Sequence, residues 1–270
     1  MTISEKRSQM EHYEGASVCP EDFLSDWQTK MGQLGDIHIT REPIQLGNPC
    51  AVYEKLHITT EHGETVTARY IRPASDAESY PTLLMYHDMG REVRGWHHMT
   101  RFAGIGYAVI ALENRIGTDV TMETIDKETL EQCYVDALTV AKAALQMSET
   151  NAEQLSAWGE GFGGGLAMAV SAVLLQKVRC AALHPMPAEL PAAWSYLDVE
   201  NFACFLHSPL LLGTALMDEI ALPWGQYACY NRASCEKRHL VYPKYAHERI
   251  NAFENEHLKF LNQKPSDSRQ

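Results

Sequence analysis

From about residue 80 onwards, the chain repeats one pattern: a short apolar run, a polar or glycine-containing break, and a longer stretch with helical spacing. Short apolar runs without polar alternation are typical of parallel strands that are buried on both faces. Strands that alternate with helices predict an α/β fold, in which helices cover both faces of a mainly parallel sheet. The predicted strands are 82–86, 107–112, 155–158, 179–183, 209–213 and 239–242, and the predicted helices are 94–104, 128–146, 163–176, 224–233 and 247–262.

The first part of the chain has other patterns. Apolar residues at helical spacing follow Pro20 and predict a helical lead-in. Residues 55–72 alternate between apolar and polar positions, with His62 and Gly63 in the middle, and predict a hairpin. The predicted organisation is an N-terminal helical extension (1–40), an α/β domain (41–262) and a flexible polar tail (263–270).

The composition is that of a globular protein with an acidic surface. The chain has 270 residues, of which 45% are hydrophobic, and its 23 Lys and Arg against 35 Asp and Glu give a net charge of −12. This length is sufficient for one sizeable core. Because the basic residues form no cluster, we expect no nucleic-acid partner.

The sequence also predicts where the protein is found. Residues 1–14 are polar and lack the apolar region of a signal peptide, and no apolar stretch reaches the roughly 18 residues of a membrane span. The seven cysteines are odd in number and lack C-x-x-C spacing, which favours reduced thiols. We therefore expect a cytoplasmic protein with no membrane partner. No His or Cys set has metal-ligand spacing, so we expect neither a metal nor another cofactor.

A glycine-rich turn carries the most informative motif. Residues 158–165 read WGEGFGGG and lie between a predicted strand and a predicted helix. This is the layout of the nucleophile elbow G-x-Ser-x-G, with Gly161 at the position of the nucleophile. Registers centred on the neighbouring residues place Trp158 or Glu160 where the tight turn needs a small residue. Phosphate binding at this helix N-terminus is a further hypothesis, although the run has neither a Walker lysine nor a clean G-x-G-x-x-G.

Two candidate partners follow the elbow in the order acid, then histidine. Asp218 and His247 each lie just after a predicted strand, and open α/β sheets place their sites beyond the carboxyl ends of strands. The alternative interpretation is a surface aspartate and a histidine that begins a helix. Order and position together favour a catalytic dyad.

Short segments spread over nearly the whole chain form one set of motifs. They are 13–15 (YEG), 20–23 (PEDF), 104–112 (GIGYAVIAL) with 114–115 (NR), 163–167 (GGGLA), 195–203 (SYLDVENFA), 216–218 (LMD) and 242–248 (YPKYAHE). With these motifs the chain resembles the acetyl xylan esterases and cephalosporin-C deacetylases, the seventh carbohydrate-esterase family. The resemblance implies an α/β-hydrolase fold in which Asp218 orients His247 and His247 is the base.

The chain departs from the family pattern at the site. Gly161 replaces the catalytic serine, Phe162 replaces the glutamine that usually follows it, and Met89 stands where a tyrosine is expected near the oxyanion hole. The segment between residues 183 and 195 is much shorter than the family's helical insertion, which implies a reduced cap. The backbone N–H groups of Met89 and Phe162 are expected to form an anion-binding pair.

Glycine offers no oxygen for an acyl-enzyme, so we considered other nucleophiles. Ser156 is expected to be buried within a strand, and Thr214 and Cys204 to lie near strand ends, but the sequence places none of them beside His247.

The leading hypothesis is a non-catalytic or strongly impaired esterase relative that binds a small ligand or a protein partner at the old site. The alternative is an active hydrolase, deacetylase or lyase in which the Asp218–His247 dyad acts on water or substrate without an acyl-enzyme. A phosphate- or nucleotide-binding module is the third hypothesis, and a homo-oligomer is left open.

Overall fold

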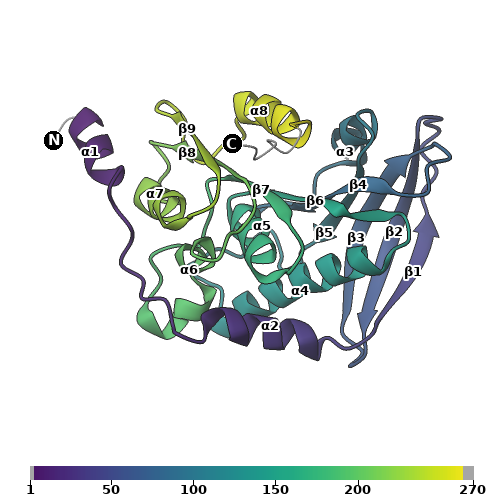
Figure 1. The fold of residues 1–270 in the computed structure, drawn as a ribbon, viewed down its shortest axis with the longest axis horizontal. Helices are drawn as coiled ribbons and strands as arrows, with labels where there is room; N and C mark the ends of the chain where they lie inside the picture. Colours follow the sequence, from purple (N-terminus) through teal and green to yellow (C-terminus); the bar gives the residue numbers. More distant parts are fainter. Residues whose placement is uncertain (1–2, 264–270) are drawn as a thin grey trace, which may run out of the picture.

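This computed structural model describes residues 3–263. Its centre is a nine-stranded sheet (Figure 1). The strand order is β1-β2-β3-β5-β4-β6-β7-β8-β9; β1, β2 and β3 pair antiparallel, β3 pairs antiparallel with β5, and the pairs from β5 to β9 are parallel. The strands are β1 (Ile37–Pro43), β2 (Ala51–Thr60), β3 (Thr65–Pro73), β4 (Tyr80–Tyr86), β5 (Ala108–Glu113), β6 (Thr150–Glu160), β7 (Val178–Leu183), β8 (Leu210–Ala215) and β9 (Lys237–Tyr242).

Helices cover both faces of this sheet. Figure 1 shows α3 and α8 on one side and α2, α4 and α5 on the other. The helices are α1 (Ile3–Met10), α2 (Phe23–Gln33), α3 (Trp96–Ala103), α4 (Lys127–Gln146), α5 (Phe162–Val173), α6 (Val199–Ala203), α7 (Pro223–Arg232) and α8 (Asn251–Leu261), with a 3₁₀ turn over Ala192–Leu197. The α/β fold class predicted from the sequence, a mainly parallel sheet with helices on both faces, is confirmed.

The two helical layers correspond to two apolar clusters, because successive side chains of a strand point to opposite faces. In β4, Leu84 and Tyr86 belong to the cluster under α2, α4 and α5, whereas Leu83 and Met85 belong to the cluster under α3 and α8. All four side chains are at most 1% exposed. Full burial of such side chains stabilises the fold by roughly 1.5–3 kcal/mol each.

The predicted hairpin and six parallel strands are all present, and most predicted helices match within a few residues. One boundary was wrong: the helix predicted from residue 247 begins at Asn251, so His247 lies in the loop between β9 and α8. No helix among the described residues is long and apolar enough to cross a membrane. Most of the predicted flexible tail, residues 264–270, lies outside the described residues.

Candidate active site

The carboxyl ends of the central parallel strands bring the predicted site residues to one edge of the sheet. Met89 follows β4, Gly161 lies between β6 and α5, Phe162 begins α5, Asp218 follows β8 and His247 follows β9. Ligands of open α/β sheets bind beyond these strand ends. The site residues predicted from the sequence therefore lie at the same edge of the sheet.

The strand–turn–helix of the elbow is sterically dependent on small residues. A Cβ at Gly159 would lie 2.0 Å from the carbonyl oxygen of Gly163, and a Cβ at Gly163 would lie 2.2 Å from the carbonyl oxygen of Tyr86. Real Cβ atoms essentially never show contacts under 3.0 Å, so both positions require glycine. These two glycines let β6 and α5 pack closely around residue 161.

Gly161 has the backbone conformation of an elbow, with φ +56° and ψ −125°. This left-handed region favours glycine, and other residues there are strained. An added Cβ would lie 1.9 Å from Oδ1 and 2.3 Å from Cγ of Asp88. The space that a nucleophilic side chain would occupy therefore holds the carboxylate of Asp88.

Asp88 makes three hydrogen bonds in this space. Its Oδ1 accepts the backbone N–H groups of Met89 at 2.9 Å and of Phe162 at 2.8 Å, and its Oδ2 lies 2.9 Å from Nε2 of His247. The two N–H groups are the anion-binding pair expected from the sequence, and the anion that they bind is the protein's own side chain. The Asp88 side chain is only 4% exposed.

Asp88 was not among the residues predicted from the sequence, although the adjacent Met89 was. A signal was present, because an acidic residue directly after a buried strand, next to a predicted oxyanion donor, faces the same strand ends as the other site residues. What the sequence could not supply is the side-chain rotamer, which turns the carboxylate toward Gly161.

Asp218 and His247 form the expected dyad geometry. The Nδ1 atom of His247 lies 2.8 Å from Oδ2 of Asp218. The other carboxylate oxygen of Asp218 accepts the backbone N–H groups of Ile220 and Ala221, each at 2.9 Å. Burial alone would raise the pKa of Asp218, but the hydrogen bond to His247 and these other interactions outweigh it, so the pKa is lowered.

His247 is consequently held between two carboxylates. Burial disfavours its charged form, but the hydrogen bonds to Asp218 and Asp88, with the charges of both groups, raise its pKa to about 9. At neutral pH the imidazole therefore carries a proton on each nitrogen, and an imidazolium cannot accept a further one. In this state His247 is an acid and not a base.

Arginine side chains join the loops around the site. Nη2 of Arg91 donates to the backbone carbonyl of His247 at 2.8 Å, and its Nε lies 3.6 Å from Oδ2 of Asp88. Glu160, the last residue of β6, is buried and accepts Nη2 of Arg94 at 2.7 Å. The elbow is thus fixed by an ion pair on one side and by the Asp88 carboxylate on the other.

A second histidine lies against the dyad. His184 follows β7, is 2% exposed, and has a positive φ of 49°. Its Nε2 lies 3.0 Å from the carbonyl oxygen of Glu248, and its Nδ1 lies 3.3 Å from Oδ2 of Asp218 without a hydrogen bond. Burial lowers the pKa of His184 to about 4, so it is neutral at physiological pH and packs on His247 with ring centroids 5.3 Å apart.

The structure places the three alternative nucleophiles away from His247. Ser156 is buried in β6, and Thr214 Oγ1 lies 2.8 Å from Nε2 of His239. Cys204 was expected near a strand end, but it follows the last turn of α6, where its thiol donates to the carbonyl oxygen of Glu200. Both ring nitrogens of His247 instead have aspartate partners.

A small apolar cavity adjoins the site. Its volume is about 260 Å³. Its wall residue Met186 donates its backbone N–H to the carbonyl oxygen of Gly161, and its wall residues Ile220 and Ala221 bind Asp218. The full lining is Met122, Pro185, Met186, Pro187, Ala188, Glu189, Leu190, Ile220, Ala221, Leu222 and Gly225.

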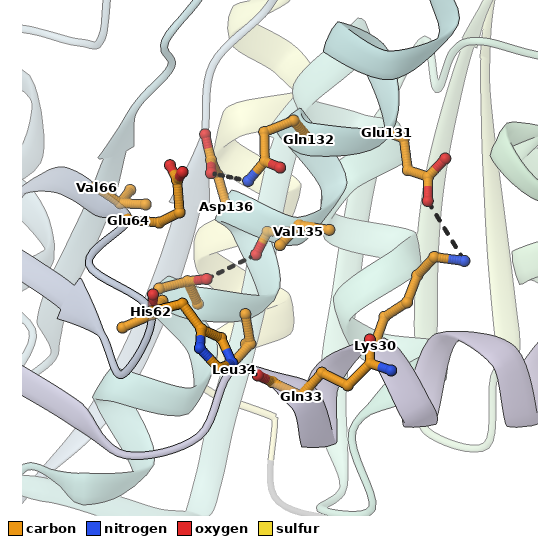
Figure 2. Close-up of a pocket in the computed structure, with 12 residues that line it drawn as sticks. Lys30, Gln33, Leu34, His62, Glu64, Val66, Glu131, Gln132, Val135 and Asp136 are labelled. Atoms are coloured by element: carbon orange, nitrogen blue, oxygen red, sulfur yellow. Dashed lines mark hydrogen bonds and ion pairs between the residues drawn. The ribbon is translucent and has the colours of Figure 1, made fainter.

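Another cavity, of about 270 Å³, lies between α2, α4 and the turn after β2 (Figure 2). Its charged lining residues are already paired: Lys30 with Glu131 at 3.4 Å, and Asp136 with Arg115 at 2.6 Å. Within residues 3–263 no group of three or more His, Cys, Asp or Glu side chains is arranged to hold a metal ion.

The mixed sheet, its two helical layers and the elbow between β6 and α5 define an α/β-hydrolase. The family model for acetyl xylan esterase matches residues 3–132 and 184–264. The chain belongs to the acetyl xylan esterase family.

Solved structures agree with this assignment. Acetyl xylan esterase 1 from Thermoanaerobacterium sp. JW/SL YS485 superposes with a TM-score of 0.82 at 21% identity, over 97% of this chain and 98% of that chain. The acetyl xylan esterase from Paenibacillus sp. R4 gives a TM-score of 0.86 at 18% identity, over 97% and 99%. A cold-adapted esterase from an Arctic intertidal metagenomic library gives 0.66 at 15% identity, over 83% and 97%.

Proposed function

We propose that this member of the acetyl xylan esterase family does not hydrolyse acetyl esters through an acyl-enzyme. The observation that carries the proposal is the position of Asp88, whose carboxylate takes both backbone N–H donors and the Nε2 side of His247. An acyl substrate would meet no hydroxyl at Gly161 and no free donors for its carbonyl oxygen.

Both losses are large in enzymes that use this chemistry. Removal of a serine nucleophile costs about 10⁶ in turnover, and removal of one oxyanion donor costs about 10²–10³. A protonated His247, with its pKa of about 9, would also be a poor base at neutral pH. Esterase activity is therefore absent or very low.

A small apolar molecule is the ligand that we propose for the old site. The cavity beside Gly161 and Asp218 has mainly apolar walls. Its volume of about 260 Å³ is just below the roughly 300–1,000 Å³ of pockets for drug-sized ligands. Ile220 and Leu222 in its wall are 66% and 52% exposed, so its rim is apolar as well.

Turnover of p-nitrophenyl acetate tests the proposal. We expect background rates for the wild type, for Gly161→Ser and for Asp88→Gly, because each still lacks either the hydroxyl or free oxyanion donors. The double variant Asp88→Gly/Gly161→Ser restores both and is expected to gain roughly a hundredfold or more. That gain should disappear when His247→Ala is added. Wild-type turnover that is lost in His247→Ala would contradict the proposal.

A second candidate function is an enzyme that needs no acyl-enzyme. It is favoured by the hydrogen-bonded chain Asp88–His247–Asp218, in which Nε2 of His247 lies 2.9 Å from Oδ2 of Asp88 and Nδ1 lies 2.8 Å from Oδ2 of Asp218. Carboxylates and an imidazole in such contact are able to exchange protons with a substrate or water. If this second function is correct, Asp88 takes part in the reaction and does not only occupy the two backbone N–H donors.

A further inference from the structure

The two carboxylate oxygens of Asp88 have different surroundings. Oδ1 accepts both backbone N–H groups, from Met89 and Phe162. Within residues 3–263 no backbone N–H donates to Oδ2, which faces Nε2 of His247 at 2.9 Å and Nε of Arg91 at 3.6 Å. One oxygen is thus anchored where an oxyanion is normally bound, and the other points to the acid–base group.

We propose that Asp88 is a nucleophile, and that its Oδ2 attacks a saturated carbon that carries a leaving group, as in a small alkyl halide or epoxide. This inference rests on the second candidate function. Carboxylate nucleophiles that form covalent intermediates are an established form of catalysis. Asp88 would replace the missing side chain of Gly161 from a different strand end.

The occupied oxyanion hole determines which substrate class fits. Attack on an acyl carbon develops an oxyanion on the substrate, and the donors that would bind it are already taken by Oδ1 of Asp88. Displacement at a saturated carbon develops no such oxyanion. The geometry therefore favours alkyl over acyl substrates in the first step.

The same donors become useful in the second step. In the first step a bond forms between Oδ2 and the substrate carbon, and the bond to the leaving group breaks with the electron pair on the leaving group. A halide then departs, whereas the oxygen of an opened epoxide stays attached to the substrate and takes the proton of His247 Nε2. Water then adds to Cγ of the resulting ester and gives a proton to Nε2 of His247. The negative charge of the tetrahedral intermediate falls on Oδ1, against the N–H groups of Met89 and Phe162.

Collapse of this intermediate completes the cycle. The bond between Cγ and the alkyl-bearing oxygen breaks, and His247 returns the proton to the departing alcohol. The Asp88 carboxyl group, now with one oxygen from water, loses its proton and returns to the carboxylate. With an alkyl halide the net products are an alcohol and hydrogen halide; with an epoxide the net product is a diol, and the proton returns to His247. Asp218 positions His247 throughout, through the contact at 2.8 Å.

The protonation of His247 is compatible with both steps. The charge of Asp88 helps to raise the pKa of the imidazole to about 9. Alkylation neutralises that carboxylate and removes its contribution, so the pKa of His247 falls and the proton can leave. The base would thus become available only when the ester is present.

Exposed apolar side chains close to the site also suit such substrates. Met217, Ile220 and Leu222, in the loop that carries Asp218, are 60%, 66% and 52% exposed. Met217 donates its backbone N–H to the carbonyl oxygen of Tyr245, another exposed apolar side chain near His247. Solvent-facing apolar groups around a buried charged site are suited to small alkyl compounds that carry no charge.

The test uses the full chain with bromobutane and butylene oxide, and mass spectrometry of the peptide that contains Asp88. With protein in excess in water labelled with heavy oxygen, the wild type is expected to incorporate one labelled oxygen into Asp88. In His247→Gln the ester should accumulate toward one alkyl group per chain. Asp88→Asn should lose both signals, whereas Asp76→Asn, an exposed control in the loop before β4, should keep them.

Absence of label and adduct at Asp88 with both electrophiles would overturn the inference. Alkylation of other carboxylates to the same extent as Asp88 would overturn it too. The incorporation of heavy oxygen into Asp88 is measured on the wild-type protein, so this part of the test remains valid even when a variant does not fold. Because these probes contain no acyl group, the outcome is separate from the p-nitrophenyl acetate result, which alone decides the first proposal.

Discussion

At the scale of single residues, the Asp88 carboxylate and a side chain at residue 161 would occupy the same space. A side chain at residue 161 would collide with the carboxylate, and the carboxylate is held there by two N–H groups and His247. The two residues must therefore be changed together to recreate a serine site. This coupling is measurable as a free energy.

Gly161→Ser should destabilise the fold by more than backbone strain alone. A non-glycine residue at φ +56° costs on the order of 1–3 kcal/mol, and the contact of 1.9 Å with Asp88 adds to it. Gly63→Ser is the matched control, because Gly63 also has a positive φ but no atom within 4 Å of an added Cβ. Urea unfolding should show the larger loss at residue 161, and the excess should vanish in the Asp88→Gly background. Equal losses at both glycines would contradict the model of a steric clash.

Asp88→Asn should lower the pKa of His247 from about 9 toward its ordinary value. The substitution removes one of the two carboxylates that stabilise the imidazolium, while Asp218 remains. NMR titration of the imidazole measures the change. Asp76→Asn is the control for the loss of one surface charge and should leave the titration in place. An unchanged His247 titration in Asp88→Asn would mean that the two groups do not interact.

At the scale of elements, much of the fold could be predicted from hydrophobic pattern alone. The parallel strands are buried runs, and the elbow follows from the spacing of Gly159, Gly161 and Gly163. Gly159 lies in close contact with α5, and Gly163 with the end of β4. The dyad of Asp218 and His247 was predictable because strand ends converge at one edge.

The remaining features depend on contacts that are distant in the sequence. Strand β1 is mostly exposed and carries no apolar run, so its pairing with β2 had no signal in the pattern. The helix after β9 begins at Asn251 because the preceding loop is tied to its surroundings, including through Arg91 and the carbonyl oxygen of His247. The rotamer of Asp88 is set by donors from two different strand ends, and no local spacing records it.

The end of β6 depends on a buried ion pair. The side chains of Glu160 and Arg94 are 4% and 5% exposed, and Arg94 also contacts Glu254. Removal of one partner of a buried pair is expected to cost about 3–5 kcal/mol, because it leaves a charge poorly compensated. Glu160→Gln should therefore lower the free energy of unfolding by roughly this amount or somewhat less, since Glu254 remains.

Glu256→Gln is the control for this prediction. Glu256 pairs with Arg238 and Lys259 on the surface, where their side chains are 49% and 68% exposed. Exposed pairs contribute about 0–1 kcal/mol, so chemical denaturation should show little change. Similar effects at Glu160 and Glu256 would show that the pair at the end of β6 does not anchor the elbow.

At the scale of the whole molecule, the chain keeps the fold of the acetyl xylan esterases. The chain superposes on two acetyl xylan esterases over 97% of its length at 21% and 18% identity. The family model matches 3–132 and 184–264, so the region it leaves out, 133–183, contains β6, the elbow and α5. The segment outside the match therefore includes Gly161, although the sheet and its strand ends have the fold of these esterases.

The charged site should also make global stability depend on pH. The pKa of His247 is raised from 6.5 to about 9 on folding, so the folded state binds a proton more tightly than the unfolded state. This contribution is fully present below pH 6.5 and is lost as the pH rises through about 9. It amounts to about 3 kcal/mol as an order of magnitude. Urea unfolding of the wild type across this window should show a fall that is much smaller in His247→Gln and unchanged in His207→Gln, which alters an exposed histidine. A fall of equal size in His247→Gln would assign the pH dependence to other groups, and the imidazolium between Asp88 and Asp218 would then not contribute to the stability of the fold.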